Sequence, residues 1–178
     1  DTAAGGWFST TGRDHSVLLR LKEDYDGAEP AAGSVSVHNL LMLSHLTEDQ
    51  GMTERIDSAL RAVAARVTGV GRASPMMLAS LSTYYTGVPQ LTIVGSAEDP
   101  STDALVAAIR ARYLPSAVLV RLDPAKRDPF TRLMPWTEGT ALGGGRATAY
   151  LCHEFACRAP TTSPEAFAAQ LDALGPKG

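Results

Sequence analysis

Residues 89–122 read PQLTIVGSAEDPSTDALVAAIRARYLPSAVLVRL, and this stretch decides the fold of the second half of the chain. The short, β-rich run at 91–94 is closed by Gly95, which is typical of a buried strand. A helix is expected over 100–113, followed by a second buried strand at 117–122. A helix of this length is what a crossover between two parallel strands requires, so the sequence predicts a βαβ unit.

In the residues before this stretch, the apolar side chains are spaced as they are in helices. Residues 34–46 carry Ser34 as a candidate N-cap and apolar residues on more than one stripe, which predicts a helix buried on most sides. Residues 53–67 place their apolar side chains on one face, as an outer helix does. A third helix is expected to begin at Ser74 and to end before Gly87. Fully apolar and one-faced helices in alternation suggest a two-layer helical array.

The remaining C-terminal residues complete a mixed α and α/β fold class. Residues 123–146 are expected to be rich in loops, residues 149–151 to form a third strand, and a last helix to open at 162–165. We therefore predict two domains, a helical one at 1–87 and a small α/β module at 88–178.

Composition excludes several classes of function. The chain has 178 residues, 44% of them hydrophobic, and a net charge of −3, which gives no basic field for binding nucleic acid. The most apolar run, 35–46, is too short and too often interrupted by polar residues to span a membrane. Two cysteines make no disulfide framework and no signal peptide is visible, so a cytoplasmic location is expected. The chain starts at Asp1 rather than Met, and we expect an upstream part to have been removed.

Two carboxylates, Asp26 and Glu29, lie on a glycine-containing turn that feeds a helix. They could divide acid and base roles on a sugar or grip its hydroxyls; alternatively they only cap the helix. His15 could shuttle protons, or be a plain exposed loop residue. Trp7 could stack on a sugar ring, or pack in a core.

The segment from Cys152 to Cys157, with His153, offers three candidate metal ligands without an obvious fourth, so no metal is expected. The two cysteines are candidates for a redox pair, and otherwise are two free thiols; we expect both to be reduced. His38 and His45 lie two helical turns apart, too far to share a metal, and satisfied interior histidines are the better interpretation.

The turn after Gly95 has the outline of a nucleotide-binding loop, but no further glycines follow in the required pattern. Glu98, Asp99 and Asp103 crowd the helix start with negative charge and would repel a phosphate. NAD and nucleoside triphosphates are rejected, and no cofactor is expected.

Three patterns in order carry a family resemblance: GGWF at 5–8 with DH at 14–15, YDGAEP at 25–30, and TAYLC at 148–152 with Cys157 and Ala159-Pro160. Together they resemble the C-terminal region of the YyaL / spermatogenesis-associated protein 20 family. Members of that family look like a thioredoxin-like domain fused to a six-hairpin (α/α) toroid, similar to N-acylglucosamine 2-epimerase and glycosidase toroids.

The resemblance implies that residues 1–87 are the C-terminal portion of such a toroid and that the thioredoxin-like domain and most of the toroid lie outside this chain. In these toroids the loops that enter inner helices line a central cleft. This keeps a ligand role open for the turn at 26–30. Our catalytic candidates are Asp26, Glu29 and His15, and our substrate-binding candidates are Trp7, Tyr25 and Ser34. One departure is that the family's usual Ser-Gly-Asn-Ser after Pro30 is Ala-Ala-Gly-Ser here, so an amide that could orient a ligand is absent.

Our first hypothesis is that the parent is a carbohydrate-active or epimerase-like toroid, and that this chain supplies one side of its cleft and is inactive alone. The competing hypothesis is a non-enzymatic scaffold or interaction module in a redox-linked assembly. The expected partners are the remainder of the parent or a companion chain, bound through the apolar 35–46 helix, and a sugar ligand. Neither nucleic acid nor a membrane is expected as a partner.

Overall fold

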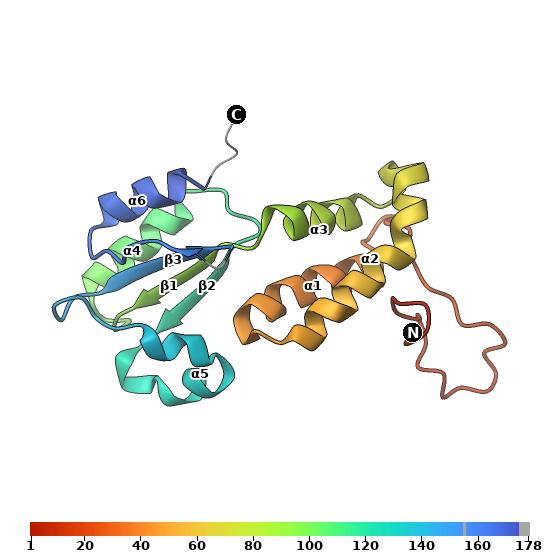
Figure 1. Ribbon diagram of the computed structural model, residues 1–178, viewed down its shortest axis with the longest axis horizontal. Coiled ribbons are helices and arrows are strands. Elements are labelled where there is room, and N and C mark those ends of the chain that lie inside the picture. Colours follow the sequence, from red (N-terminus) through yellow and green to blue (C-terminus); the bar gives the residue numbers. More distant parts are fainter. Residues whose placement is uncertain (155, 175–178) are drawn as a thin grey trace. The chain divides into compact units, whose positions relative to one another are not determined.

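The computed structural model describes residues 1–154 and 156–174, and the chain divides into two compact units (Figure 1). The first unit covers Asp1–Thr86 and the second covers Gly87–Gly178. Each unit has its own cluster of buried apolar side chains. The assignment of the first unit to an (α/α) toroid stays a prediction.

The first unit is helical after an N-terminal segment without helix or strand. Its helices are α1 (Ala32–Thr47), α2 (Gln50–Val70) and α3 (Pro75–Thr86), with the short 3-10 helix η1 (Gly71–Ala73) before α3. Helix α1 packs against both α2 and α3. The cluster of buried apolar residues consists of Val37, Leu41, Ile56, Ala59 and Met77.

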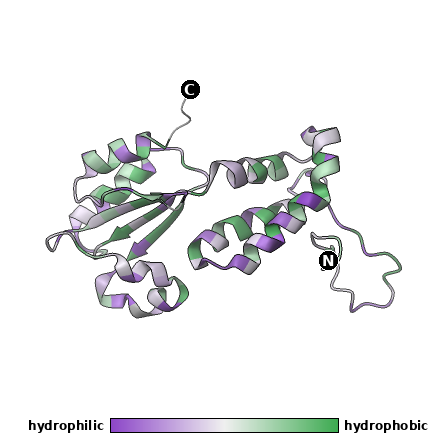
Figure 2. Ribbon diagram, in the orientation of Figure 1, coloured by the Kyte–Doolittle hydropathy of each residue, from purple (hydrophilic) through white to green (hydrophobic). Residues whose placement is uncertain are grey.

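Helix α2 is the one-faced outer helix that its spacing predicts. Ile56 and Ala59 are buried, whereas Glu54, Arg55 and Arg61 are exposed, and polar and apolar residues alternate along the helix in Figure 2. Asp49 caps its start by accepting a hydrogen bond from the Gly51 N–H at 2.8 Å. The predicted start of the third helix is also confirmed, since α3 begins at Pro75.

The start of α1 differs from the prediction. The helix begins at Ala32, and its N-cap residue Ala31 has no side chain that can accept a hydrogen bond, so Ser34 is not the cap. Ser34 lies inside the first turn and is buried. Along this helix Ser34, Val37, Leu41 and Ser44 are buried, whereas Leu43 is 43% exposed.

The second unit is built on a four-stranded sheet in the order β2-β1-β3-β4. Strands β1 (Gln90–Val94) and β2 (Val118–Leu122) are parallel and are joined through α4 (Pro100–Arg110), which confirms the βαβ unit. Strand β3 (Thr148–His153) runs antiparallel to β1, and the two-residue β4 (Ala156–Cys157) runs antiparallel to β3.

Helices α4 and α6 (Pro164–Asp172) pack against each other and against β3, on one face of the sheet in Figure 1. Their buried side chains, including Leu105, Ile109, Phe167 and Leu171, form the core of the unit with the strands. Between β2 and β3, the chain forms η2 (Pro124–Lys126), α5 (Asp128–Leu133) and η3 (Pro135–Gly139). The segment predicted to be loop-rich therefore contains short helices.

Candidate functional site

The Asp26 carboxylate is bound by backbone amides at the start of two helices. One oxygen, Oδ1, accepts a hydrogen bond from the Ala31 N–H at 2.8 Å. The other, Oδ2, accepts hydrogen bonds from the N–H groups of Met76 at 2.7 Å and Met77 at 3.4 Å. Ala31 is the N-cap residue of α1, and Met76 and Met77 lie in the first turn of α3, so none of these amides has a partner within its helix. Asp26 therefore caps both helices at once.

The electrostatic surroundings of Asp26 keep it ionised. Burial raises the pKa of the carboxyl, but hydrogen bonds from the amides of Ala31, Met76 and Met77 favour the anion and outweigh burial, so the pKa lies below its usual value. A carboxyl that serves as general acid on a sugar needs a raised pKa. The geometry thus favours the capping interpretation of Asp26 over an acid role.

The other candidates close to Asp26 in sequence differ from it in how they are exposed and bonded. They are Glu29, Tyr25 and Ser34. The Glu29 side chain is exposed, and its backbone carbonyl accepts a hydrogen bond from the Gly27 N–H at 3.0 Å. Tyr25 is 60% exposed, whereas Ser34 is 1% exposed and lies within α1. One buried anion beside one exposed carboxyl is not the arrangement of two carboxyls sharing a cleft. The binding or catalytic roles of these residues stay predictions.

His15 is exposed in the N-terminal segment. Its neighbour Asp14 accepts hydrogen bonds from the backbone N–H and the hydroxyl of Ser16, at 2.9 and 2.7 Å. Asp14 is therefore engaged with Ser16. In α1, Nδ1 of His45 lies 2.9 Å from the Leu41 carbonyl oxygen. For His38, the buried Nδ1 has no hydrogen-bond partner among the described residues, so at this nitrogen the histidine is not satisfied.

Trp7 is the candidate residue that lines a hollow. The hollow has a volume of about 190 Å³ and lies between the N-terminal segment and α2, with Lys22 and Asp24 among its lining residues. Lys22 is paired with Asp1 at 2.8 Å and Asp24 with Arg66 at 3.2 Å. Trp7 also packs against the helical core. Both interpretations of Trp7, as a core residue and as a ligand contact, fit this position.

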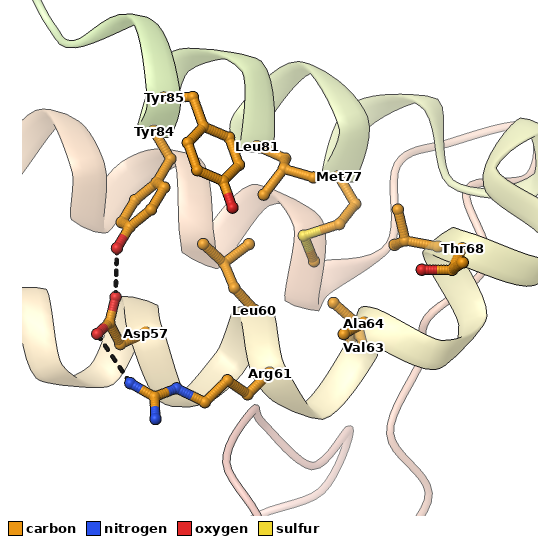
Figure 3. Close-up of a pocket in the computed structure, with 11 residues that line it drawn as sticks. Asp57, Leu60, Arg61, Val63, Ala64, Thr68, Met77, Leu81, Tyr84 and Tyr85 are labelled. Carbon is orange, nitrogen blue, oxygen red and sulfur yellow. Dashed lines mark hydrogen bonds and ion pairs between the residues drawn. The ribbon is translucent and has the colours of Figure 1, made fainter.

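A larger groove, of about 390 Å³, lies between α2 and α3 (Figure 3). It exists because both helices pack on α1 and make few contacts with each other. Its floor is apolar and is formed by Leu60, Val63, Val67, Met77 and Leu81. The three residues from α2 are recognisable in the sequence as one helical face, but their spacing does not reveal that α3 leaves that face partly uncovered.

One end of the groove is polar. The Tyr84 hydroxyl donates a hydrogen bond to Asp57 Oδ1 at 2.6 Å, and the Arg61 guanidinium donates to Asp57 Oδ2 at 3.0 Å (Figure 3). The hydrogen bond from Tyr84 lowers the pKa of Asp57, while the same bond raises the pKa of Tyr84. Asp57 is therefore an anion and Tyr84 a neutral phenol at physiological pH. This end can orient a ligand but offers no activated nucleophile.

Replacing Tyr84 with Phe is expected to lower the free energy of unfolding by about 1–2 kcal/mol, because a hydrogen bond to a charged acceptor is lost. Tyr85→Phe is the matched control, since Tyr85 is 75% exposed. The control is expected to change the free energy of unfolding by less than about 0.5 kcal/mol. Chemical denaturation followed by circular dichroism measures both. Equal stability of the Tyr84 and Tyr85 variants would show that the bond to Asp57 contributes nothing.

The cysteines are joined, so the expectation of two reduced thiols is wrong. Cys152 on β3 and Cys157 on β4 are direct cross-strand partners and form a disulfide, with their Cα atoms 4.0 Å apart. Antiparallel pairing in a tight hairpin brings the two sulfurs together, which the spacing in sequence did not reveal. Sulfurs in a disulfide are not thiolate ligands for a metal. No group of three candidate metal ligands occurs among residues 1–154 and 156–174.

Within the described part of the chain, no helix has both the length and the apolar character needed to cross a bilayer. The cytoplasmic location stays a prediction.

Comparison with known proteins identifies relatives over most of the chain. It is 35% identical to human spermatogenesis-associated protein 20 over 165 residues, which is 92% of this chain and 21% of that protein. The rat and mouse proteins of the same name are each 34% identical over the same share of both chains. The chain thus spans about a fifth of the length of these curated relatives. No family model matches, and no solved structure matches.

These relatives confirm the resemblance that the three sequence motifs indicate. The match covers nearly all of this chain and a limited part of each relative, which is consistent with one C-terminal region of a larger protein.

Proposed function

Because the chain is homologous to one region of spermatogenesis-associated protein 20, we propose that it is the C-terminal segment of a larger protein and has no turnover by itself. In this proposal the helical unit completes an (α/α) toroid of the glycosidase and epimerase type, in a protein that also carries a thioredoxin-like domain. The activity of the whole protein is directed at a carbohydrate, and its location is the cytoplasm.

The observation that carries the proposal is the use of both Asp26 oxygens by backbone amides. Acid and base groups must lie on opposite sides of a reacting sugar ring. Of the two carboxylates on the 26–29 turn, one is a buried cap and the other is exposed. This segment therefore supplies structure and at most one wall of a cleft, with Trp7 and Glu29 as its candidate ligand contacts.

The purified chain is expected to show no turnover with sugar substrates of epimerases or glycosidases. The measurement is product formation at high enzyme concentration, with the full-length parent assayed beside it as the positive control. Turnover by the isolated chain that disappears in a Glu29→Gln variant would refute the proposal of an inactive segment.

The groove between α2 and α3 favours a second function for the segment, that of an interaction module. Its floor is apolar, and an amphipathic helix presents apolar side chains at the spacing that such a groove accepts. The relatives are far longer than this chain, which covers 21% of their length. We propose a helix from the remainder of the larger protein as the occupant. The proposed helix in the groove does not depend on whether the whole protein is an enzyme.

The groove proposal predicts that Leu81→Lys weakens binding of the remaining part of the parent, supplied as a separate chain, by at least about tenfold. A lysine at this position puts an unpaired charge against an apolar partner. Leu78→Lys is the matched control, because Leu78 is 39% exposed on α3, the helix that carries Leu81, and does not line the groove. Titration calorimetry measures both affinities. Equal weakening by the two variants, or self-association of the chain through the groove, would contradict the proposed occupant.

A further inference from the structure

The disulfide between Cys152 and Cys157 lies at the margin of the second unit. It joins β3 to β4, the last strand in the sheet order, and encloses only residues 153–156 between its two ends. Cys157 is exposed and Cys152 is partly buried. One sulfur-bearing residue is therefore open to solvent, while its partner is more protected.

The buried core of the second unit does not include this bond. The buried cluster is formed by residues of β1, α4, β3 and α6, and neither cysteine belongs to it. Strand β4 pairs with β3 at two positions, Cys152 with Cys157 and His153 with Ala156. Without the disulfide, the adjacent hydrogen bond from the Arg158 N–H to the Leu151 carbonyl oxygen and the central strand pairs, β1 with β2 and β1 with β3, are still available to hold the sheet together.

This disulfide is open to solvent at Cys157 and lies outside the buried core. These are the properties of an exchangeable disulfide rather than of a structural one. A structural disulfide typically resists reduction, and an exposed one is typically the labile or reactive kind. We propose that the Cys152–Cys157 disulfide is a thiol-exchange site whose substrate is a dithiol, and that Cys157 is the sulfur attacked.

The exchange is balanced with a dithiol as the reductant. A thiolate of the dithiol attacks Cys157 Sγ, a new S–S bond forms, and the Cys152–Cys157 bond breaks with its electron pair leaving on Cys152 Sγ. Cys152 then takes a proton from solvent. The second thiolate of the dithiol then attacks the dithiol's first sulfur, which is bonded to Cys157 Sγ; the S–S bond of the oxidised dithiol forms, and Cys157 leaves as a thiolate. Two electrons pass to the protein, and the dithiol becomes a cyclic or bridged disulfide.

The first test uses the native chain without denaturant, treated with dithiothreitol and then with an alkylating maleimide. Mass spectrometry is expected to show both cysteines alkylated, while circular dichroism and the thermal midpoint indicate an intact fold. Hydrogen exchange is expected to rise at residues around 152–158 and not at β1 or α4. Thiols that become reactive only in denaturant would overturn the proposal, and so would a chain that holds two free thiols in a glutathione disulfide buffer.

The second test identifies the attacked sulfur. In Cys152→Ser, the remaining Cys157 is expected to form a mixed disulfide with an aromatic disulfide reagent at least about tenfold faster than Cys152 does in Cys157→Ser, because access governs exchange. Equal rates, or a faster reaction at Cys152, would contradict the assignment of Cys157. Trapping the mixed disulfide on the native chain with a monothiol, followed by peptide mapping, gives the same answer without a substitution.

Discussion

Asp26→Ala is expected to lower the free energy of unfolding by about 3 kcal/mol, because one carboxylate serves two helix starts. The substitution leaves the amides of Ala31 and Met76 without their acceptor at a site where the aspartate residue is only 9% exposed. Asp26→Asn is expected to cost about 2 kcal/mol, since an Asn amide nitrogen cannot accept from the second helix and the charge is lost. Urea denaturation followed by circular dichroism measures both variants.

Glu29→Gln is the matched control, because Glu29 is on the same turn and its side chain is exposed. It is expected to change the free energy of unfolding by less than about 0.5 kcal/mol. An Asp26→Asn variant as stable as the wild type would contradict the capping role. It would also restore the interpretation of Asp26 and Glu29 as a pair in a cleft.

Gly95→Ala is expected to destabilise the second unit by about 2–3 kcal/mol, because an added methyl has no room there. A Cβ at this position would meet the Thr102 hydroxyl and would lie 2.9 Å from Ala147 Cβ. Both neighbours are buried, at 1% exposure, and cannot move aside cheaply. Chemical denaturation of the variant measures the loss.

The control for this variant is Gly139→Ala in the same unit, where a Cβ would meet nothing within 4 Å. It is expected to change stability by less than about 0.5 kcal/mol. If both glycine variants have the same denaturation midpoint as the wild type, the close packing at the end of β1 does not contribute to stability. The result expected for Gly95 gives that glycine a packing role, in keeping with the rejection of a nucleotide-binding turn.

The elements that rest on local spacing could be predicted from the sequence. Strands β1 and β2, the helix between them and the one-faced helix α2 all follow from apolar periodicity. These signals lie within a few residues of the element they define, so no tertiary contact has to be known.

The features that rest on tertiary contacts could not be predicted in the same way. The hydrogen bond from Met76 to Asp26 joins residues 50 positions apart, and no local pattern reports it. Ser34 has a hydroxyl side chain of the kind that caps helices. The helix nevertheless begins before Ser34, because Asp26 supplies the oxygen that accepts the hydrogen bond from the Ala31 N–H. The groove likewise depends on how α2 and α3 share α1, and the disulfide depends on the register of β3 with β4.

The pH dependence of stability is expected to carry the signature of a capping carboxylate. The pKa of Asp26 in the folded chain lies below its unfolded value. Its contribution is therefore fully present above the unfolded pKa and is lost as the pH falls through the folded pKa. Asp26→Asn removes this contribution, so its stability is expected to decline less steeply than that of the wild type on acidification.

The most direct test of a capping rather than an acid role is an NMR titration of the Asp26 carboxyl in the intact chain. The capping account predicts a pKa below the usual aspartate value, with the amide protons of Ala31 and Met76 shifting at that same pH. A pKa raised above the usual value, with those two amide protons unresponsive, would contradict it and would identify Asp26 as a candidate general acid.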